Sequence, residues 1–290
     1  MNPKSFEYFA PSNLGEVLDL LEKHQGEAKI IAGGQSLLPI MKMRLASPRY
    51  LVDLRNVVGL SYISEDESGV RIGAMITHHV IASSPVITGN CQVLSEAAGM
   101  IGDPLIRNRG TIGGSLCHAD PSADYPAIIL ALDGKLVVMG KDGQRTEEAG
   151  QFFQDTFVTS VKPNEVLREV WVPKIAADSA AVYERLSRGP GGFVLVGVVA
   201  FLRMKGQRCE AVRVALSGVA PTPVRSKAAE ETLEGKTLSD PLIQSASRRA
   251  VEGLNPSPVV HASTEYQLAM VEVIMKRAFE RCRHKIESRR

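Results

Sequence analysis

The segments IIAGGQSLLP (Ile30–Pro39) and RGTIGGSL (Arg109–Leu116) share one local design, in which a Gly-Gly pair and then a serine follow an apolar residue. Glycine allows a positive φ, and because it lacks a Cβ it lets backbone N–H groups come directly against a ligand. The hydroxyls of Ser36 and Ser115 add a donor to each turn. Such a hollow suits a phosphate. A single Gly-Gly is most often only a turn, but two matched turns favour a ligand with two phosphates, or one long ligand gripped from both sides.

Neither segment fits the common nucleotide fingerprints. The chain has no G-x-G-x-x-G after a strand and no G-x-x-x-x-G-K-[ST] at these positions, which argues against Rossmann and P-loop sites. An acidic pair, Asp120 and Asp124, flanks Pro121 just beyond the second glycine pair. Asp124 stands where it could cap the helix that starts at Tyr125. A carboxylate there could equally accept a hydrogen bond from a ribityl hydroxyl or a flavin N–H, and the sequence leaves both readings open.

Composition excludes several classes of protein. The 34 Lys and Arg nearly balance the 32 Asp and Glu, and no basic stripe interleaved with aromatic residues indicates a nucleic-acid partner. The four cysteines, Cys91, Cys117, Cys209 and Cys282, form no Cys-x-x-Cys pair, so we expect neither a zinc site nor an iron–sulfur cluster in this chain. Any metal chemistry is therefore expected on another chain.

No stretch of the sequence is long and apolar enough to predict a membrane span. The uncharged run Gly189–Leu202, for example, is fourteen residues and includes four glycines and a proline, against the ~20 apolar residues that a spanning helix requires. The N-terminus has no apolar core of signal-peptide length. We therefore expect the protein in the cytoplasm.

Hydrophobic periodicity divides the 290 residues into three units, which is ordinary for this length. We expect a first unit over residues 1–56, a second over 57–175, and a third over 176–290 that opens after a small, polar linker at Pro173–Ala181. The expected helices are Leu14–His24, Leu37–Leu45, one after Thr77, one near Val93–Gly99, Asp124–Leu132, Arg225–Leu233, Leu242–Leu254 and Glu265–Lys285. The expected strands are Ala28–Ile31, Tyr50–Leu54, Val70–Met75, Lys135–Met139, Val166–Val172, Tyr183–Leu186, Val194–Met204 and Cys209–Leu216. Strands followed by helices in the last unit indicate an α+β class.

The two glycine segments, in this order, closely resemble the FAD-binding (medium) subunits of the molybdenum hydroxylase family, to which carbon monoxide dehydrogenase and xanthine dehydrogenase belong. The family's first FAD loop, AGG-x-S, matches Ala32, Gly33, Gly34, Gln35 and Ser36. Its second, TIGGS, matches Thr111, Ile112, Gly113, Gly114 and Ser115 without a change. The resemblance covers essentially the whole chain. It implies a two-part FAD-binding fold of the p-cresol methylhydroxylase / vanillyl-alcohol oxidase type, followed by a C-terminal α+β domain that completes the flavin site.

The resemblance also implies roles for residues outside the two loops. Ile30 and Ile31, before the first loop, would lie against the flavin, and Asp124 would contact its ribityl or isoalloxazine portion. Val166 or Leu167 would reach a ring face, and Phe193 corresponds to the aromatic residue beside the N5 edge. Where relatives use a lysine at the carbonyl edge this chain has Glu184, so Arg185 is expected to substitute for it. No catalytic side chain and no metal ligand is expected in this chain.

The function implied by the resemblance is that of an electron-transfer subunit. FAD would take electrons from a two-iron two-sulfur cluster on a small partner subunit, after a molybdopterin-bearing large subunit has oxidised the substrate, and pass them to an external acceptor. The complex would be a heterotrimer, doubled to a heterohexamer. A stand-alone flavin-dependent reductase and a flavin-less scaffold subunit of the same fold remain alternatives. The sequence leaves open the substrate (carbon monoxide, an N-heterocycle or a purine) and the acceptor (quinone, NAD or oxygen).

Overall fold

A short parallel sheet organises the N-terminal unit in the computed structural model, which describes residues 2–289. Its strands lie in the order β1-β3-β2. Leu51 and Val52 on β3 point to opposite faces, because side chains alternate along a strand. Val52 packs in one cluster with Leu21 of α1, and Leu51 in another with Met41 of α2. The bounds are β1 Glu7–Phe9, α1 Leu14–Lys23, β2 Ala28–Ile31, α2 Leu37–Lys42, β3 Tyr50–Asp53 and the 3-10 turn Leu54–Asn56.

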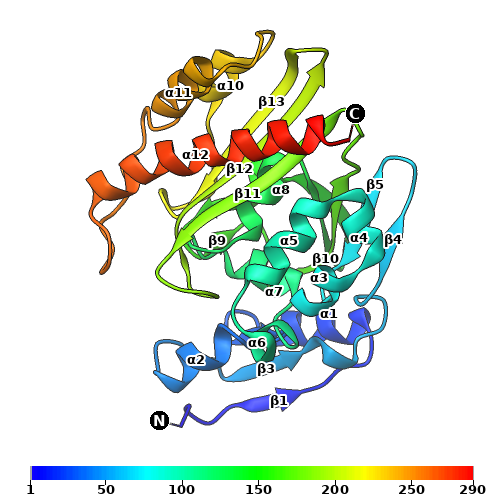
Figure 1. Ribbon diagram of the computed structural model, residues 1–290. Coiled ribbons are helices and arrows are strands. Elements are labelled where there is room, and N and C mark those ends of the chain that lie inside the picture. Colours follow the sequence, from blue (N-terminus) through cyan, green and yellow to red (C-terminus); the bar gives the residue numbers. More distant parts are fainter. Residues whose placement is uncertain (1, 290) are drawn as a thin grey trace.

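The second unit carries an antiparallel sheet with its helices packed against it (Figure 1). Its strand order is β4-β5-β10-β6-β7, so β10 reaches the centre of the sheet from late in the sequence. The strands are β4 Ile63–Glu65, β5 Gly69–Gly73, β6 Lys135–Gly140, β7 Gly143–Glu148 and β10 Val166–Pro173, with a separate hairpin of β8 Phe153–Asp155 and β9 Val158–Thr159. The helices are α3 His78–Ser83, α4 Pro85–Asn90, α5 Gln92–Met100, α6 Pro104–Arg107, α7 Ile112–His118, α8 Tyr125–Ala131 and α9 Ala149–Phe152.

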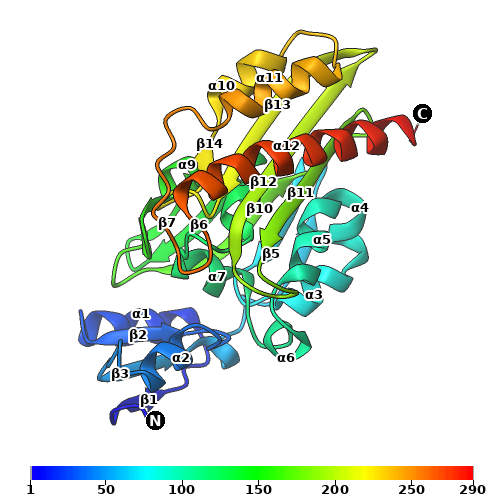
Figure 2. The same cartoon turned by 60° about the vertical axis from the view of Figure 1, so that its left-hand side comes forward.

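The third unit is a long antiparallel sheet, β11-β12-β13-β14, crossed by the helix α12 (Figures 1 and 2). Residues of one parity, such as Val182 and Val198, pack with α10, α11 and α12. Residues of the other parity, such as Tyr183 and Val199, belong to the core of the second unit. The bounds are β11 Ser179–Ser187, β12 Val194–Lys205, β13 Arg208–Ser217, β14 Val224–Arg225, α10 Lys227–Leu233, α11 Asp240–Arg249 and α12 Thr264–Glu287. One face of this sheet is thus the interface with the second unit.

These elements confirm the expected α+β class, with a C-terminal part of antiparallel strands followed by helices. Some expected bounds were wrong. The helix expected to end at Leu45 (α2) ends at Lys42, and the one expected to end at Leu254 (α11) ends at Arg249. The strand β11 begins at Ser179 and not at Tyr183, so it takes up part of the expected linker Pro173–Ala181. Among the described residues, no helix is both long and apolar enough to cross a membrane.

Candidate flavin site

The two glycine loops, 80 positions apart, lie in contact. A Cβ added to Gly33 would fall 2.1 Å from the carbonyl oxygen of Arg109, and one added to Gly114 would fall 3.5 Å from the Cβ of Ala32. Glycine at position 33 is therefore required by the approach of one loop to the other. The first unit and the second meet at this point, so one ligand can touch both loops.

The first loop presents unpaired backbone donors. It follows β2, turns at Gly34 with φ +74°, and enters α2 after Ser36. Within residues 2–289, the N–H groups of Gly33, Gly34, Gln35 and Ser36 donate to no protein acceptor. Gln35 and Ser36 are exposed, which leaves these donors accessible. Four consecutive N–H groups without a protein acceptor at one turn can bind an anion.

The second loop has a different geometry from the one expected. Neither Gly113 nor Gly114 has a positive φ, because both lie in the first turn of α7. Gly113 donates its N–H to the Ala74 carbonyl oxygen at 2.9 Å, and Gly114 donates to Oγ1 of the capping residue Thr111 at 3.0 Å. A Cβ on Gly113 would lie 2.5 Å from that of Ala74. The expectation of two matched hollows is therefore wrong: the second glycine pair lets α7 pack closely, and both of its N–H groups already donate within the protein.

Asp124 occupies the N-cap position of α8, but its side chain makes no capping hydrogen bond. Its Oδ1 instead accepts from Arg185 Nη1 at 2.7 Å and from the Tyr183 hydroxyl at 2.9 Å. Both members of the ion pair are buried, with 8% and 7% of their side chains exposed. Burial raises the pKa of Asp124 above its ordinary value, and Arg185 opposes that rise. The reading of Asp124 as a helix cap is therefore wrong.

The parity of β11 explains why Arg185 reaches Asp124. Tyr183 and Arg185 are two positions apart, so they share the sheet face that packs on the second unit. Arg185 also donates through Nη2 to the carbonyl oxygen of Gly192, at 2.8 Å. The structure thus joins Asp124, Arg185 and the loop before β12 in one buried polar group.

The remaining predicted residues differ in exposure. Phe193 ends the loop before β12 and is 75% exposed. Leu167 lies in the core of the second unit, 3% exposed, and Val166 is 1% exposed. Ile31 is 6% exposed, while Ile30 and Ser115 are half-buried. The contact of each of these residues with FAD stays a prediction.

His78 supports the second loop, a role that the sequence did not predict. Its backbone N–H donates to the carbonyl oxygen of Gly110 at 2.9 Å, and its Nδ1 lies 3.0 Å from the hydroxyl of Tyr125. A Cβ on Gly110 would meet His78 Nε2 at 2.6 Å. Burial lowers the pKa of His78 to about 4. The Thr77-led helix start was visible in the sequence, but its contact with a loop thirty positions away was not.

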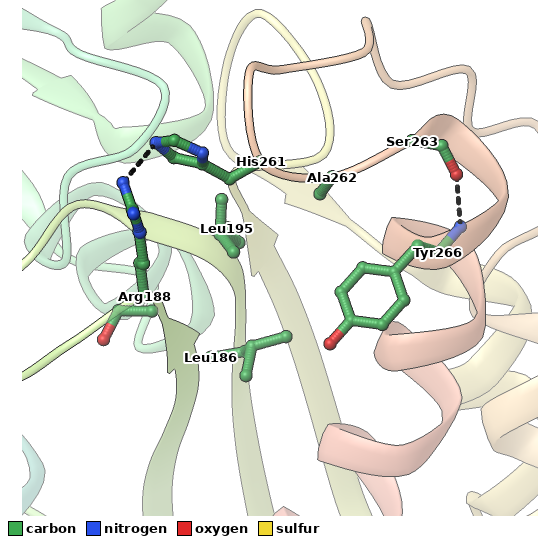
Figure 3. Close-up of a pocket in the computed structure, with 8 residues that line it drawn as sticks. Leu186, Arg188, Leu195, His261, Ala262, Ser263 and Tyr266 are labelled. Carbon is green, nitrogen blue, oxygen red and sulfur yellow. Dashed lines mark hydrogen bonds between the residues drawn. The ribbon is translucent and has the colours of Figure 1, made fainter.

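An open cavity of about 470 Å³ lies at the C-terminal end of β11 (Figure 3). Leu186 and Tyr266 provide apolar walls, and Arg188 Nη1 lies 3.0 Å from His261 Nε2 at the rim. Leu186 packs with the cluster under α12, so this cavity opens on the face of β11 opposite to Arg185. None of the predicted flavin residues lines it.

Comparisons with known proteins confirm the expected FAD-binding fold. Residues 4–175 match the family described as the FAD-binding domain in molybdopterin dehydrogenase. Residues 181–282 match the carbon monoxide dehydrogenase flavoprotein C-terminal domain. The chain is 38% identical to the carbon monoxide dehydrogenase medium chain of Hydrogenophaga pseudoflava, covering 96% of this chain and 97% of that protein. It is 36% identical to the nicotine 6-hydroxylase medium subunit of Paenarthrobacter nicotinovorans, with the same coverage.

Solved structures give the same result. A chain of carbon monoxide dehydrogenase from Hydrogenophaga pseudoflava superposes with a TM-score of 0.96 at 39% identity, covering 98% of this chain and 99% of that one. A chain of quinoline 2-oxidoreductase from Pseudomonas putida 86 superposes with a TM-score of 0.94 at 34% identity, covering 99% of both. The similarity therefore extends over all three units.

Proposed function

Because this chain belongs to the FAD-binding medium subunits of the molybdenum hydroxylase family, we propose that it relays electrons from an iron–sulfur partner subunit to an external acceptor. The observation that supports this most directly is the row of free N–H groups at residues 33–36, in contact with the second loop. FAD carries two linked phosphates, and these donors fit an anion of that kind. In this proposal the chain is an oxidoreductase subunit whose substrate is oxidised on a partner.

The residues present fit FAD in the following way. The first loop would hold the pyrophosphate through backbone N–H groups, and the Ser36 hydroxyl would add a donor. The segment 111–115 would form the facing wall, with Ser115 as its half-buried polar side chain. Ile30, Ile31 and Phe193 would provide apolar contacts, and Asp124, Arg185 and Leu167 complete the predicted set.

FAD, when bound, exchanges electrons one at a time with an iron–sulfur cluster and in pairs with a two-electron acceptor. This chain's own contribution is binding, orientation and exclusion of water. We propose that it assembles with an iron–sulfur small subunit and a molybdopterin large subunit into a heterotrimer, doubled to a heterohexamer, in the cytoplasm. The substrate class is then a property of the large subunit.

Anaerobic reduction experiments test this relay. The chain is purified alone and together with its partner subunits, and the visible flavin absorbance is followed after a candidate substrate is added. We expect flavin in the chain, no bleaching in the isolated chain, and bleaching in the complex. Substrate-dependent bleaching of the isolated chain would favour the stand-alone reductase. Failure to take up FAD on reconstitution would favour the scaffold subunit. As a control of the relay, bleaching should be lost when only the iron–sulfur subunit is left out of the complex.

A further inference from the structure

The loop Arg188–Phe193 joins β11 to β12 and is rich in glycine, with Gly189, Gly191 and Gly192 around Pro190. A loop of this composition loses much conformational entropy when it is fixed in one shape. It nevertheless makes a tight turn, in which Gly192 donates its N–H to the Gly189 carbonyl oxygen at 3.0 Å. Phe193, the residue predicted to lie beside the flavin, is its last residue. The anchors of this loop therefore decide where Phe193 lies.

The first anchor is Arg185. Its Nη2 donates to the Gly192 carbonyl oxygen at 2.8 Å, and its Nη1 to Asp124 Oδ1 at 2.7 Å. Ser187 adds a link, because its hydroxyl donates to the Gly189 carbonyl oxygen at 2.9 Å. Hydrogen bonds of a buried guanidinium to a carboxylate are strong and geometrically defined. The loop is thereby tied to Asp124, which belongs to the second unit.

The second anchor is a close backbone contact. Gly191 has φ +71°, and a Cβ there would lie 2.4 Å from the carbonyl oxygen of Gly102. Gly102 follows α5, and Arg107 Nη1 donates to the carbonyl oxygens of Ile101 and Gly102, each at 3.0 Å. The turn at Ile101 and Gly102, against which the loop packs, is thus fixed by Arg107. The two contacts thus tie the loop, which belongs to the third unit, to Asp124 and Gly102 of the second unit.

We infer that Arg185 is a positioning residue: with the Gly191–Gly102 contact, it fixes the loop 188–193 and so places Phe193 at the flavin site. This inference rests on the proposed FAD site, and it adds a role for Arg185 that needs no contact with the flavin. The guanidinium carries it out by bridging Asp124 and Gly192. A lysine has one nitrogen in place of the planar fork and is expected not to bridge both.

Hydrogen–deuterium exchange of the full chain tests the inference, with and without FAD. In the FAD-free chain, Arg185→Gln, Arg185→Lys and Gly191→Ala should each speed exchange of amides in 188–194 by about tenfold or more, because a hydrogen bond to a charged group or a close backbone contact is lost. Arg203→Gln, at the exposed far end of β12, and Gly253→Ala, at φ +77° with open space around it, are the controls and should leave the loop unchanged. In the FAD-bound chain, iodide should quench the flavin of the loosened variants more strongly.

Unchanged exchange in both Arg185→Gln and Gly191→Ala would overturn the inference. If Arg185 acted only by contacting the flavin, its variants would weaken FAD binding but leave the loop of the FAD-free chain as it is, and Gly191→Ala would be silent. Because the exchange readout needs no flavin, it can succeed even if the chain fails to bind FAD. Melting curves check that each variant is folded, and Gly191→Ala keeps the test open should Arg185→Gln fail to fold.

Discussion

At the scale of single residues, Gly34 is the glycine of the two proposed flavin loops that has a positive φ. Its φ of +74° is one that a residue with a Cβ adopts at a cost of about 1–2 kcal/mol, and its added Cβ would lie 3.0 Å from Leu38 Cδ1. Gly34→Ala should therefore distort the row of free N–H groups and weaken FAD binding by about tenfold or more, measured by titration of the apo chain.

Gly26 is a matched control for this prediction. It has φ +76°, lies in the same unit and has nothing within 4 Å of an added Cβ. Gly26→Ala should lower the free energy of unfolding by a similar amount without changing the FAD affinity. Equal FAD affinities for the two variants would argue against a role for the first loop.

His78 gives the protein a dependence on pH that can be measured. Its pKa is lowered to about 4 in the folded chain, from an ordinary value of 6.5, because the charged form is poorly solvated there. The unfolded chain therefore binds a proton first as the pH falls, and the stabilisation present above pH 6.5 is lost between 6.5 and 4. The loss should reach up to about 3 kcal/mol.

Denaturant unfolding at several pH values checks this. His78→Gln, which can still hydrogen-bond Tyr125 but cannot titrate, should flatten the slope between pH 6.5 and 4. The exposed neighbour provides the control, since His79→Gln should keep the slope of the parent chain. A parent chain whose stability is constant over this range would contradict the assignment.

The residues that sequence reasoning could find are those whose role is local. The glycine pairs are visible because Gly-Gly followed by serine is a pattern of adjacent residues. The partner of Asp124 was not visible: Arg185 lies 61 positions away, on a strand that belongs to another unit. The capping role considered for Asp124 depended on its neighbours in sequence. In the structure its carboxylate accepts a hydrogen bond from the buried Arg185 guanidinium and none from the helix N-terminus.

At the scale of elements, α7 depends on close packing through Gly113. Alanine normally favours a helix over glycine by about 1 kcal/mol. At Gly113, however, an added Cβ would lie 2.6 Å from the Ala74 carbonyl oxygen, which the chain cannot relieve by moving a side chain alone. Gly113→Ala should therefore destabilise the protein, by about 1–3 kcal/mol in urea unfolding.

The matching substitution in α5 should have the opposite sign. Gly99 is helical, and nothing lies within 4 Å of a Cβ added to it. Gly99→Ala should thus raise the free energy of unfolding by about 0.5–1 kcal/mol. If both alanine variants were stabilised, the close contact between α7 and the segment at Ala74 would not exist as described.

Elements with a clear apolar pattern were predictable, and exposed edges were not. The strands β12 and β13 are long and alternate regularly, and their expected bounds were close to the observed ones. The strand β7, GQRTEE, has no apolar alternation because it is an exposed edge strand, which within residues 2–289 pairs with β6 alone. Its pairing with β6 is made by backbone hydrogen bonds, which leave no pattern in the side chains.

At the scale of the whole molecule, the second and third units share one core. Tyr183, Val199 and Phe201 of the third unit belong to the same cluster as Ile128 and Leu94 of the second. A fragment of residues 1–175 would expose the surfaces of α5 and α8 that this sheet covers. We expect it to bind a hydrophobic dye and to unfold with little cooperativity, whereas the full chain should unfold in one transition.

Calorimetry and dye fluorescence on the two proteins check this expectation. The control is the full chain cleaved between 175 and 179 and kept as a complex, which retains the covered surface and should bind little dye. A fragment that melted cooperatively at the temperature of the full chain would show that the second unit is stable by itself.

The alternation of side chains along β11 has a consequence for how such a protein can change over time. Odd-numbered positions pack on the second unit and even-numbered ones pack under the helices of the third, so a substitution can change one layer without changing the other. Loss or gain of one residue in this strand would exchange the two sets. Arg185 would then face the apolar cluster under the helices, and Leu186 would face Asp124. We therefore expect β11 to tolerate substitutions better than insertions or deletions.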